Sequence, residues 1–288
     1  MSAAAVVALA VLAALAVSTP AAAVDYYTGP LIDAHAHLPN ATVIDAYVAA
    51  MKRHNVRKVM LLGVGGVQPD EALWLEAAKK KYPDLVAAAV RVPDPTSMAA
   101  AGRLDVELAR TKARVMGEVH IRQTSRKIER DPSAPAFMRI LELSAQRGVP
   151  VVIHDELTAA ASASLEAALA AHREAIIVLA HAGESTPAAL ERLLARNANL
   201  RIDLSGMDFQ RTPSLANEKG PLDDAWKALI TKMPDRFLIG LDLWLAQLFE
   251  PDMLDRLMTW TRRVLGELPP DAAEQVAWKN AATLYRLD

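Results

Sequence analysis

Most of the histidines in this chain lie where predicted buried strands end. Five of the seven do so, and two carboxylates share these positions. They are His35, His37, Glu118, His120, His154, His181 and Asp242. A lone histidine after an apolar strand is usually a hydrogen-bonded core residue, but core histidines would not gather at strand ends. The chain has no cysteine, and imidazole nitrogen with carboxylate oxygen makes a good Zn²⁺ site. This pattern predicts a metal centre.

The first predicted strand ends Asp33-Ala34-His35-Ala36-His37. Side chains alternate along a strand, so His35 and His37 face the same way, about 6–7 Å apart. Two imidazoles at that spacing can bind one cation. Asp33 shares their face, and we expect its carboxylate to orient one of the histidines.

The elements that position these residues are short apolar strands alternating with amphipathic helices. Nearly continuous apolar runs are typical of parallel strands buried on both faces. Eight such β-then-α units fit a single-domain (β/α)₈ TIM barrel, whose reactive groups lie at the C-terminal strand ends. A doubly wound sheet is the alternative fold. The eight predicted strands are Leu31–Leu38, Val56–Val64, Leu85–Val92, Ala113–Ile121, Val149–Glu156, Ala175–Gly183, Leu200–Gly206 and Arg236–Leu243.

Five motifs, taken in order, resemble the amidohydrolase superfamily, and most closely its amidohydrolase-related (amidohydrolase 2) branch. The resemblance covers essentially the whole chain after residue 23 and implies a metal-dependent TIM-barrel hydrolase over residues 24–288. The motifs are Ile32–His37, His154, His181-Ala182-Gly183, Gly240-Leu241-Asp242 and the closing segment 279–285.

The resemblance also implies roles for these residues. His35, His37 and His154 would be metal ligands, and Asp242 would bind the metal and accept a proton from its water. His181 would bind a second metal or act as an acid or base, which makes Asp242 and His181 the predicted catalytic residues. We expect a divalent cation, zinc by preference.

Glu118 bears on whether one or two cations bind. No lysine ends the fourth strand, so the carbamylated-lysine bridge of some members is absent. The Gly-Glu-Val context of Glu118 resembles the bridging glutamate of the TatD-like deoxyribonuclease and phosphotriesterase-homology branches. We expect one tightly bound cation and an optional second, bridged by Glu118.

Candidate substrate-binding residues lie near the same strand ends. Arg122 and His120 share a face of the fourth strand, and a guanidinium can hold a carboxylate through two hydrogen bonds. Arg211 lies in the long segment 205–220, and long loops in compact domains are often binding loops. Trp244 has the same parity as Asp242 and is a candidate pocket wall. We expect Arg91 to form a salt bridge at the barrel rim.

Three functions remain open. The first is hydrolysis of a C–N, C–O or lactone bond of a small molecule by a metal-activated water. The second is metal-dependent decarboxylation of the aminocarboxymuconate-semialdehyde decarboxylase type, which release of carbon dioxide would distinguish. The third is a non-catalytic periplasmic barrel that binds a metal or ligand, against which the full ligand set argues.

The N-terminal segment and the net charge bear on location and partners. The apolar run from Ala3 to Val17 and the small residues Ala21-Ala22-Ala23 predict a signal peptide over residues 1–23. We therefore expect export to the periplasm or secretion, with no membrane attachment after cleavage. A net charge of −2 gives no footprint for nucleic acid. A homo-oligomer is left open.

Overall fold

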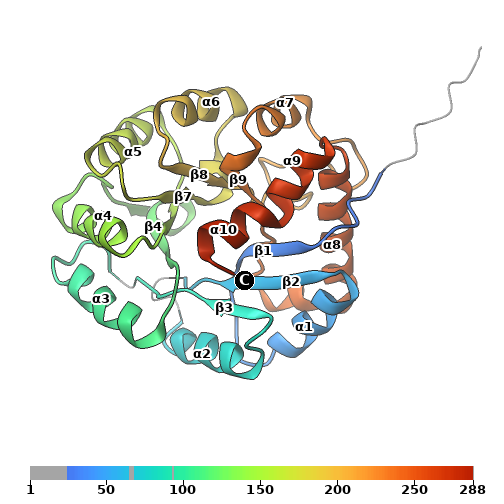
Figure 1. Cartoon of the computed structure of the whole chain (residues 1–288), viewed down its shortest axis with the longest axis horizontal. Helices are drawn as coiled ribbons and strands as arrows, with labels where there is room; N and C mark the ends of the chain where they lie inside the picture. The colour runs from blue at the N-terminus through green and yellow to red at the C-terminus, as the bar shows by residue number, and fades with distance from the viewer. Residues whose placement is uncertain (1–24, 65–67, 93, 288) are drawn as a thin grey trace, which may run out of the picture.

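The computed structural model describes residues 25–64, 68–92 and 94–287, so the predicted signal peptide lies outside the described residues. Eight parallel strands form a barrel in two sheets (Figure 1). The first sheet has the order β1 (Leu31–Ala36), β2 (Val56–Leu61), β3 (Val86–Ala88). The second has the order β5-β4-β6-β7-β8-β9. Its strands are β4 (Met116–Gln123), β5 (Ile128–Glu129), β6 (Val151–Asp155), β7 (Ile177–Leu179), β8 (Leu200–Asp203) and β9 (Phe237–Leu238).

Two seams join these sheets into a closed barrel. After β3, Val90 pairs with Met116 of β4 in a parallel bridge. On the other side, the amide of Ala34 donates to the carbonyl of Ile239 (3.0 Å), and that of Asp242 donates to the carbonyl of His35 (2.8 Å). The predicted TIM-barrel fold is confirmed.

Helices cover the outside of the barrel (Figure 1). Thr158 and Thr186 cap two of them by accepting from backbone amides, and Gly148 ends another in a left-handed conformation. The surrounding helices are α1 (Ile44–Arg53), α2 (Glu71–Lys81), α3 (Ala100–Thr111), α4 (Pro135–Arg147), α5 (Ala159–Ala171), α6 (Pro187–Arg196), α7 (Asp224–Lys232) and α8 (Pro251–Gly266). The chain closes with α9 (Pro270–Glu274) and α10 (Asn280–Tyr285).

The buried apolar side chains of the described residues form two clusters. Most buried apolar side chains fill the layer between strands and helices. A second cluster, including Ile32, Met60, Val152 and Leu238, packs with Tyr285 of α10. Within the ranges described, no helix is long and apolar enough to cross a membrane.

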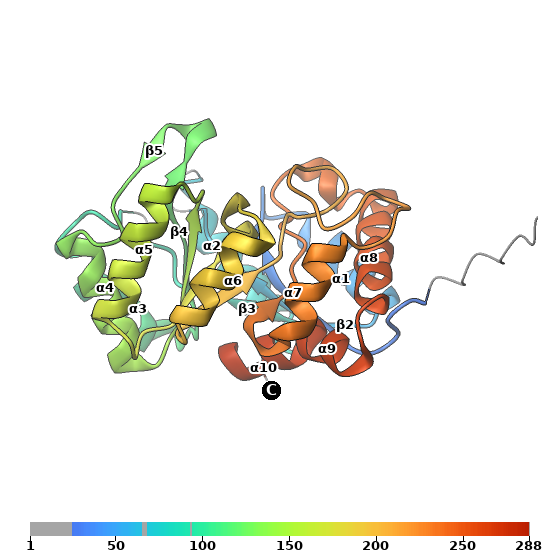
Figure 2. The same cartoon turned by 90° about the horizontal axis from the view of Figure 1, so that it is seen from above.

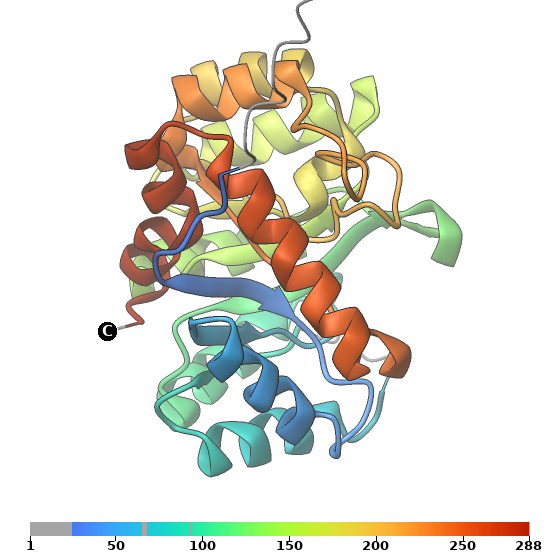
Figure 3. The ribbon, with the colours of Figure 1, turned by 90° about the vertical axis from the view of Figure 1, so that its right-hand side faces the viewer.

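Several predicted strand boundaries were wrong. β4 continues past Ile121 and turns into the antiparallel strand β5, a hairpin that the sequence pattern did not predict. This hairpin projects from the barrel (Figure 2, Figure 3). The predicted sixth and eighth strands are shorter, as β7 and β9. The backbone becomes left-handed at His181, soon after β7 ends, and at Asp242, four residues after β9 ends. The second, third and seventh strands also end earlier than predicted.

Candidate metal centre

The strand ends bring the predicted polar residues together in one buried cluster. β1 and the residues after it supply two histidines, β4 a glutamate and a histidine, and β6 a third histidine. The segments after β7 and β9 add a histidine and an aspartate. Every member is at most 7% exposed. The members are His35, His37, Glu118, His120, His154, His181 and Asp242.

Glu118 lies at the centre of this cluster. Its Oε1 is 3.2 Å from His154 Nδ1 and 3.2 Å from His181 Nε2. Its Oε2 is 3.5 Å from His37 Nε2 and 3.8 Å from His35 Nε2. The two oxygens of one carboxylate therefore face two different groups of imidazoles.

Hydrogen bonds fix which nitrogen of each histidine faces inward. His37 Nδ1 lies 2.9 Å from the carbonyl of Leu62, and His181 Nδ1 lies 2.9 Å from that of Ser205. A carbonyl only accepts, so both Nδ1 atoms carry the proton, and a neutral ring then turns an Nε2 lone pair toward the cluster.

His35 completes this arrangement. Its Nδ1 is 2.6 Å from the carboxylate of Asp203, which makes Nδ1 the protonated nitrogen. Its Nε2 is then 3.0 Å from His37 Nε2, so two lone pairs face each other. A proton or a cation between them is needed to make that contact favourable.

The charges of the cluster also favour a cation. Burial disfavours a charged His181, but Asp242 and Glu118 outweigh it and raise the pKa of His181 to about 10. Burial opposes charge at His37 too, and its pKa is nevertheless raised by Asp242 and Glu118. The neighbouring histidines hold the pKa values of Glu118 and Asp242 below their usual range in spite of burial. Both carboxylates are therefore ionised, and a divalent cation can replace the histidine protons.

Donor atoms of the cluster come within 4.8 Å of one another in overlapping groups of three, one of which contains three of the four predicted ligands. His35, His37 and Asp242 form that group, with His37 Nε2 3.3 Å from Asp242 Oδ1. His154 groups with Glu118 and His120 instead, and its ring stacks on that of His120 at 5.1 Å. Glu118 also groups with His35 and His181. His154 Nε2 is buried without a hydrogen-bond partner.

The backbone is left-handed at several positions of the centre. His181, Ala182 and Gly183 have φ values of 54°, 51° and 59°, and Asp242 has a φ of 49°. This conformation is costly for residues with a Cβ and tends to persist at functional sites.

Gly206, with a φ of 67°, lies beside Asp242. A Cβ there would come within 2.7 Å of Arg211 Nη1 and 2.9 Å of Asp242 Oδ2. Glycine therefore leaves the space in which these two side chains meet.

The predicted substrate-binding residues occupy different surroundings. Arg211 reaches the centre and places Nη1 2.7 Å from Asp242 Oδ2. Arg122 pairs with Glu129 across the hairpin, and Trp244 is 47% exposed. Arg91 lies 3.9 Å from Glu71 and donates to the carbonyl of Gln68, a rim contact of the kind expected.

The sequence interpretation missed Asp203 and Ser205 and misjudged Asp33. Asp33 accepts from the amides of His35 and Leu241 and from the hydroxyl of Tyr47, so it ties β1 to the segment after β9 and orients no imidazole. Asp203 ends β8, so the strand-end criterion that identified Asp242 would have found it too.

We predict that Asp203→Asn weakens cation binding by ~10–100-fold, the usual cost of losing a carboxylate that orients a ligating histidine. The amide can donate to His35 Nδ1 and so favours the wrong tautomer of the ring. Titration of metal-free protein with Zn²⁺ would measure the change. The matched control is Asp235→Asn, an exchange at a residue remote from the cluster. Equal affinity in Asp203→Asn and wild-type protein would contradict the role of Asp203.

A family model described as Amidohydrolase matches residues 32–287, whereas no curated protein matches the chain. A 2,6-dihydroxybenzoate decarboxylase from Rhizobium is 18% identical, with a TM-score of 0.62 over 90% of this chain and 99% of that one. An amidohydrolase from Burkholderia multivorans is 17% identical, with a TM-score of 0.61 over 90% and 100%. A dihydroxybenzoic acid decarboxylase from Polaromonas sp. JS666, solved with manganese and an inhibitor, is 15% identical, with a TM-score of 0.60 over 90% and 97%.

Proposed function

The chain belongs to the amidohydrolase family, and on that premise we propose that it is a metal-dependent hydrolase of a small molecule. One observation carries the proposal: three imidazoles turn Nε2 toward two ionised, buried carboxylates at the open end of the barrel. Such a site binds a divalent transition metal through nitrogen and oxygen. We propose zinc or manganese.

The grouping of donor atoms supports two adjacent cation positions that share Glu118. One position would use His35, His37 and Asp242 together with Glu118 Oε2. A second position would use Glu118 either with His35 and His181 or with His120 and His154. A position with fewer ligands would bind its cation less tightly. We therefore propose one tightly bound cation and an optional second.

The chemistry proposed is attack of water on a C–N, C–O or lactone carbonyl. A bound divalent cation lowers the pKa of a water toward ~7 and polarises the carbonyl. Asp242 holds one oxygen toward His37 and the other toward Arg211, so it is placed to accept the proton of the attacking water. His181 keeps a proton on Nδ1 through the Ser205 carbonyl. With one cation His181 is free to protonate the leaving group, and with two it becomes a ligand.

Arg211 supports a substrate with an anionic group. Its side chain is 33% exposed yet reaches a carboxylate that is 5% exposed, so it connects the centre with solvent. A guanidinium in this position can hold a substrate carboxylate beside the reacting carbonyl. His120, stacked on His154, and Trp244 at the rim are proposed as further walls of the substrate site.

Decarboxylation is the second candidate. Arg211 at the centre would equally hold a carboxylate that is to be lost, and two of the folds that resemble this one are decarboxylases. Below 25% identity those likenesses bear on the fold, so the reaction must be decided by its products.

A panel of esters, lactones, amides and aromatic carboxylic acids, tested against zinc- and manganese-loaded protein, decides between the candidates. We expect hydrolysis without release of carbon dioxide, and we expect Arg211→Met to raise KM for anionic substrates by ~10-fold or more, since a hydrogen bond to a charged group contributes ~1.5–3 kcal/mol. Arg122→Met is the matched control. Release of carbon dioxide would establish the decarboxylase, and no turnover of any compound would favour a binding protein.

A further inference from the structure

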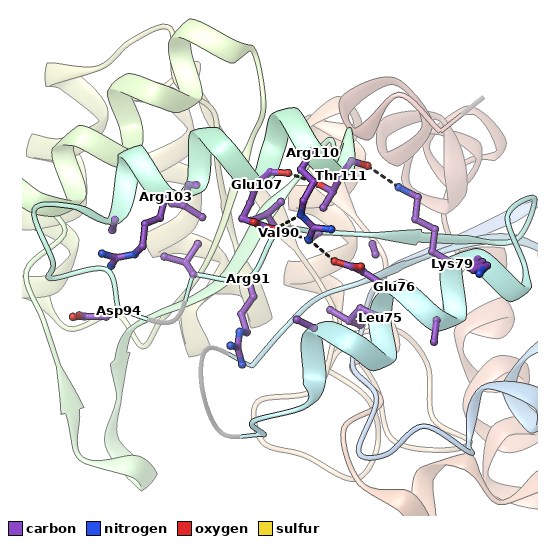
Figure 4. Close-up of a pocket in the computed structure, with 18 of the residues that line it drawn as sticks. Leu75, Glu76, Lys79, Val90, Arg91, Asp94, Arg103, Glu107, Arg110 and Thr111 are labelled. Atoms are coloured by element: carbon purple, nitrogen blue, oxygen red, sulfur yellow. Dashed lines mark hydrogen bonds and ion pairs between the residues drawn. The ribbon is translucent and has the colours of Figure 1, made fainter.

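A groove lies on the outer wall of the barrel between α2 and α3, away from the metal centre. Its volume is about 710 Å³, within the range of ~300–1,000 Å³ typical of small-molecule sites. Its walls are the two helices and its floor is β3 with the residues that follow it (Figure 4). Among the described residues that line it, none belongs to the metal cluster.

The floor of the groove is apolar and built largely from small side chains. Leu75 of α2 faces it from one wall, Leu104 and Ala100 of α3 face it from the other, and Ala88 and Val90 line the floor between them. Alanines at these positions leave open the space that larger side chains would fill. The floor can therefore bury an extended apolar group.

One end of the groove is closed by contacts between the helices. Arg110 of α3 pairs with Glu76 of α2 and with Glu107, and Lys79 donates to the carbonyl of Thr111 (3.2 Å). The charged side chains that make these contacts are therefore already paired. A ligand that entered here would have to break them.

The opposite end carries two guanidinium groups. Arg91 and Arg103 both lie there, with Asp94 near Arg103 (Figure 4). The carboxylate of Asp94 already accepts from the amide and hydroxyl of Thr96, at 3.0 and 2.6 Å. Figure 4 marks no hydrogen bond or ion pair between Arg103 and the other described residues that it draws. The lining side chains at this end carry two positive charges and one negative charge, which suits an anion. Arg91 is already 3.9 Å from Glu71 and donates to the carbonyl of Gln68, so Arg103 is the main partner left for an anion.

We propose that this groove is a binding site for a fatty-acid-like carboxylate. Its alkyl chain would lie over Val90 between Leu75 and Leu104, and its carboxylate would face Arg103, with Arg91 beside it. Removing an apolar chain from water is favourable in proportion to the apolar area that is buried. A guanidinium gives the carboxylate a fixed, charge-assisted partner, so the chain and the head group are recognised at different places.

Isothermal titration with dodecanoate, below its micellar concentration, tests this site. We expect one equivalent to bind the full-length wild-type protein. Ala72→Phe, which fills the groove from α2, and Arg103→Gln, which removes the head-group partner, should each weaken binding at least tenfold. The matched controls are Ala167→Phe on α5 and the exposed Arg173→Gln, which should bind as wild type does.

Two further measurements separate this site from the metal centre and from other occupants. Binding should persist in His35→Ala/His37→Ala protein, whereas its loss there would mean that the carboxylate binds the cation, and would overturn the proposal. Dodecanol should bind more weakly than dodecanoate. The fatty-acid site would be refuted if both compounds bound equally, or if Ala72→Phe left binding unchanged. It would also be refuted if the wild-type protein were a dimer that did not bind dodecanoate and that dissociated in the Ala72→Phe variant.

Discussion

Replacing His35 and His37 together by alanine should remove nearly all bound divalent cation, from about one or two equivalents per chain to a small fraction of one. Both rings are held with Nε2 facing the cluster, His35 by Asp203 and His37 by the carbonyl of Leu62. Alanine removes these donors and leaves Asp242 and Glu118 without them. Elemental analysis after dialysis against a weak chelator would give the metal content.

Stability and pH provide independent readouts of the same site. A cation present at 100 times its Kd stabilises the folded state by ~2.7 kcal/mol, so added Zn²⁺ should raise the unfolding midpoint of the wild type and leave that of the double variant unchanged. Protons on His37 and His181 compete with the cation. Because the pKa of His181 is raised to about 10, wild-type affinity should rise as the pH rises toward that value.

The control for the double variant is His54→Ala/His172→Ala, which removes two histidines that cap α1 and α5. That protein should keep its full metal content. If the His35→Ala/His37→Ala protein kept its metal, the cation would have to bind elsewhere and the assigned centre would be wrong.

Asp242→Asn should lower kcat by ~10²–10⁴-fold, the usual loss when a general acid–base group is removed. Asparagine keeps the shape of the side chain and an oxygen for the cation, but it cannot take the proton of the attacking water. Arg211, 2.7 Å from Oδ2 in the wild type, also loses its ionic partner. The measurement is steady-state turnover of whichever substrate the panel identifies, with metal content determined on the same sample.

A second acidic residue near the mouth supplies the comparison for Asp242. Asp208 is buried, and its pKa is raised by that burial. Its carboxylate accepts from the amide of Gln210 and belongs to none of the groups of possible metal ligands among the described residues. Asp208→Asn should therefore retain turnover within a few-fold of wild type. Near-normal turnover by fully metallated Asp242→Asn would instead place the base at His181 or Glu118.

The sequence was sufficient to predict the barrel and most of its centre. Residues 149–153 are a continuous apolar run, and the polar residues that follow such runs fall at one end of the barrel by topology alone. Counting polar residues at strand ends therefore found the members of the cluster without any knowledge of side-chain contacts.

What the sequence could not predict depends on three-dimensional contacts. Parity along β1 suggested that Asp33 would orient a histidine, but its carboxylate is taken by backbone amides from β1 and from the segment after β9. The partner of His35 is instead Asp203, 168 residues later. Parity along the strand predicted that Arg122 would face the mouth of the barrel. Its guanidinium instead pairs with Glu129 of the hairpin that was not predicted. The groove between α2 and α3 arises from helix spacing, which no local pattern encodes.

The seam between β1 and the segment after β9 gives the metal centre a place in the order of folding. It joins residues about two hundred positions apart, through Ala34 with Ile239 and His35 with Asp242. Contacts so distant along the chain carry the largest loop-closure cost, so they form late. His35 and His37 lie on one side of this seam and Asp242 on the other. The proposed cation site would be complete only after the ring of strands has closed, and a cation bound there would stabilise the closed barrel against reopening.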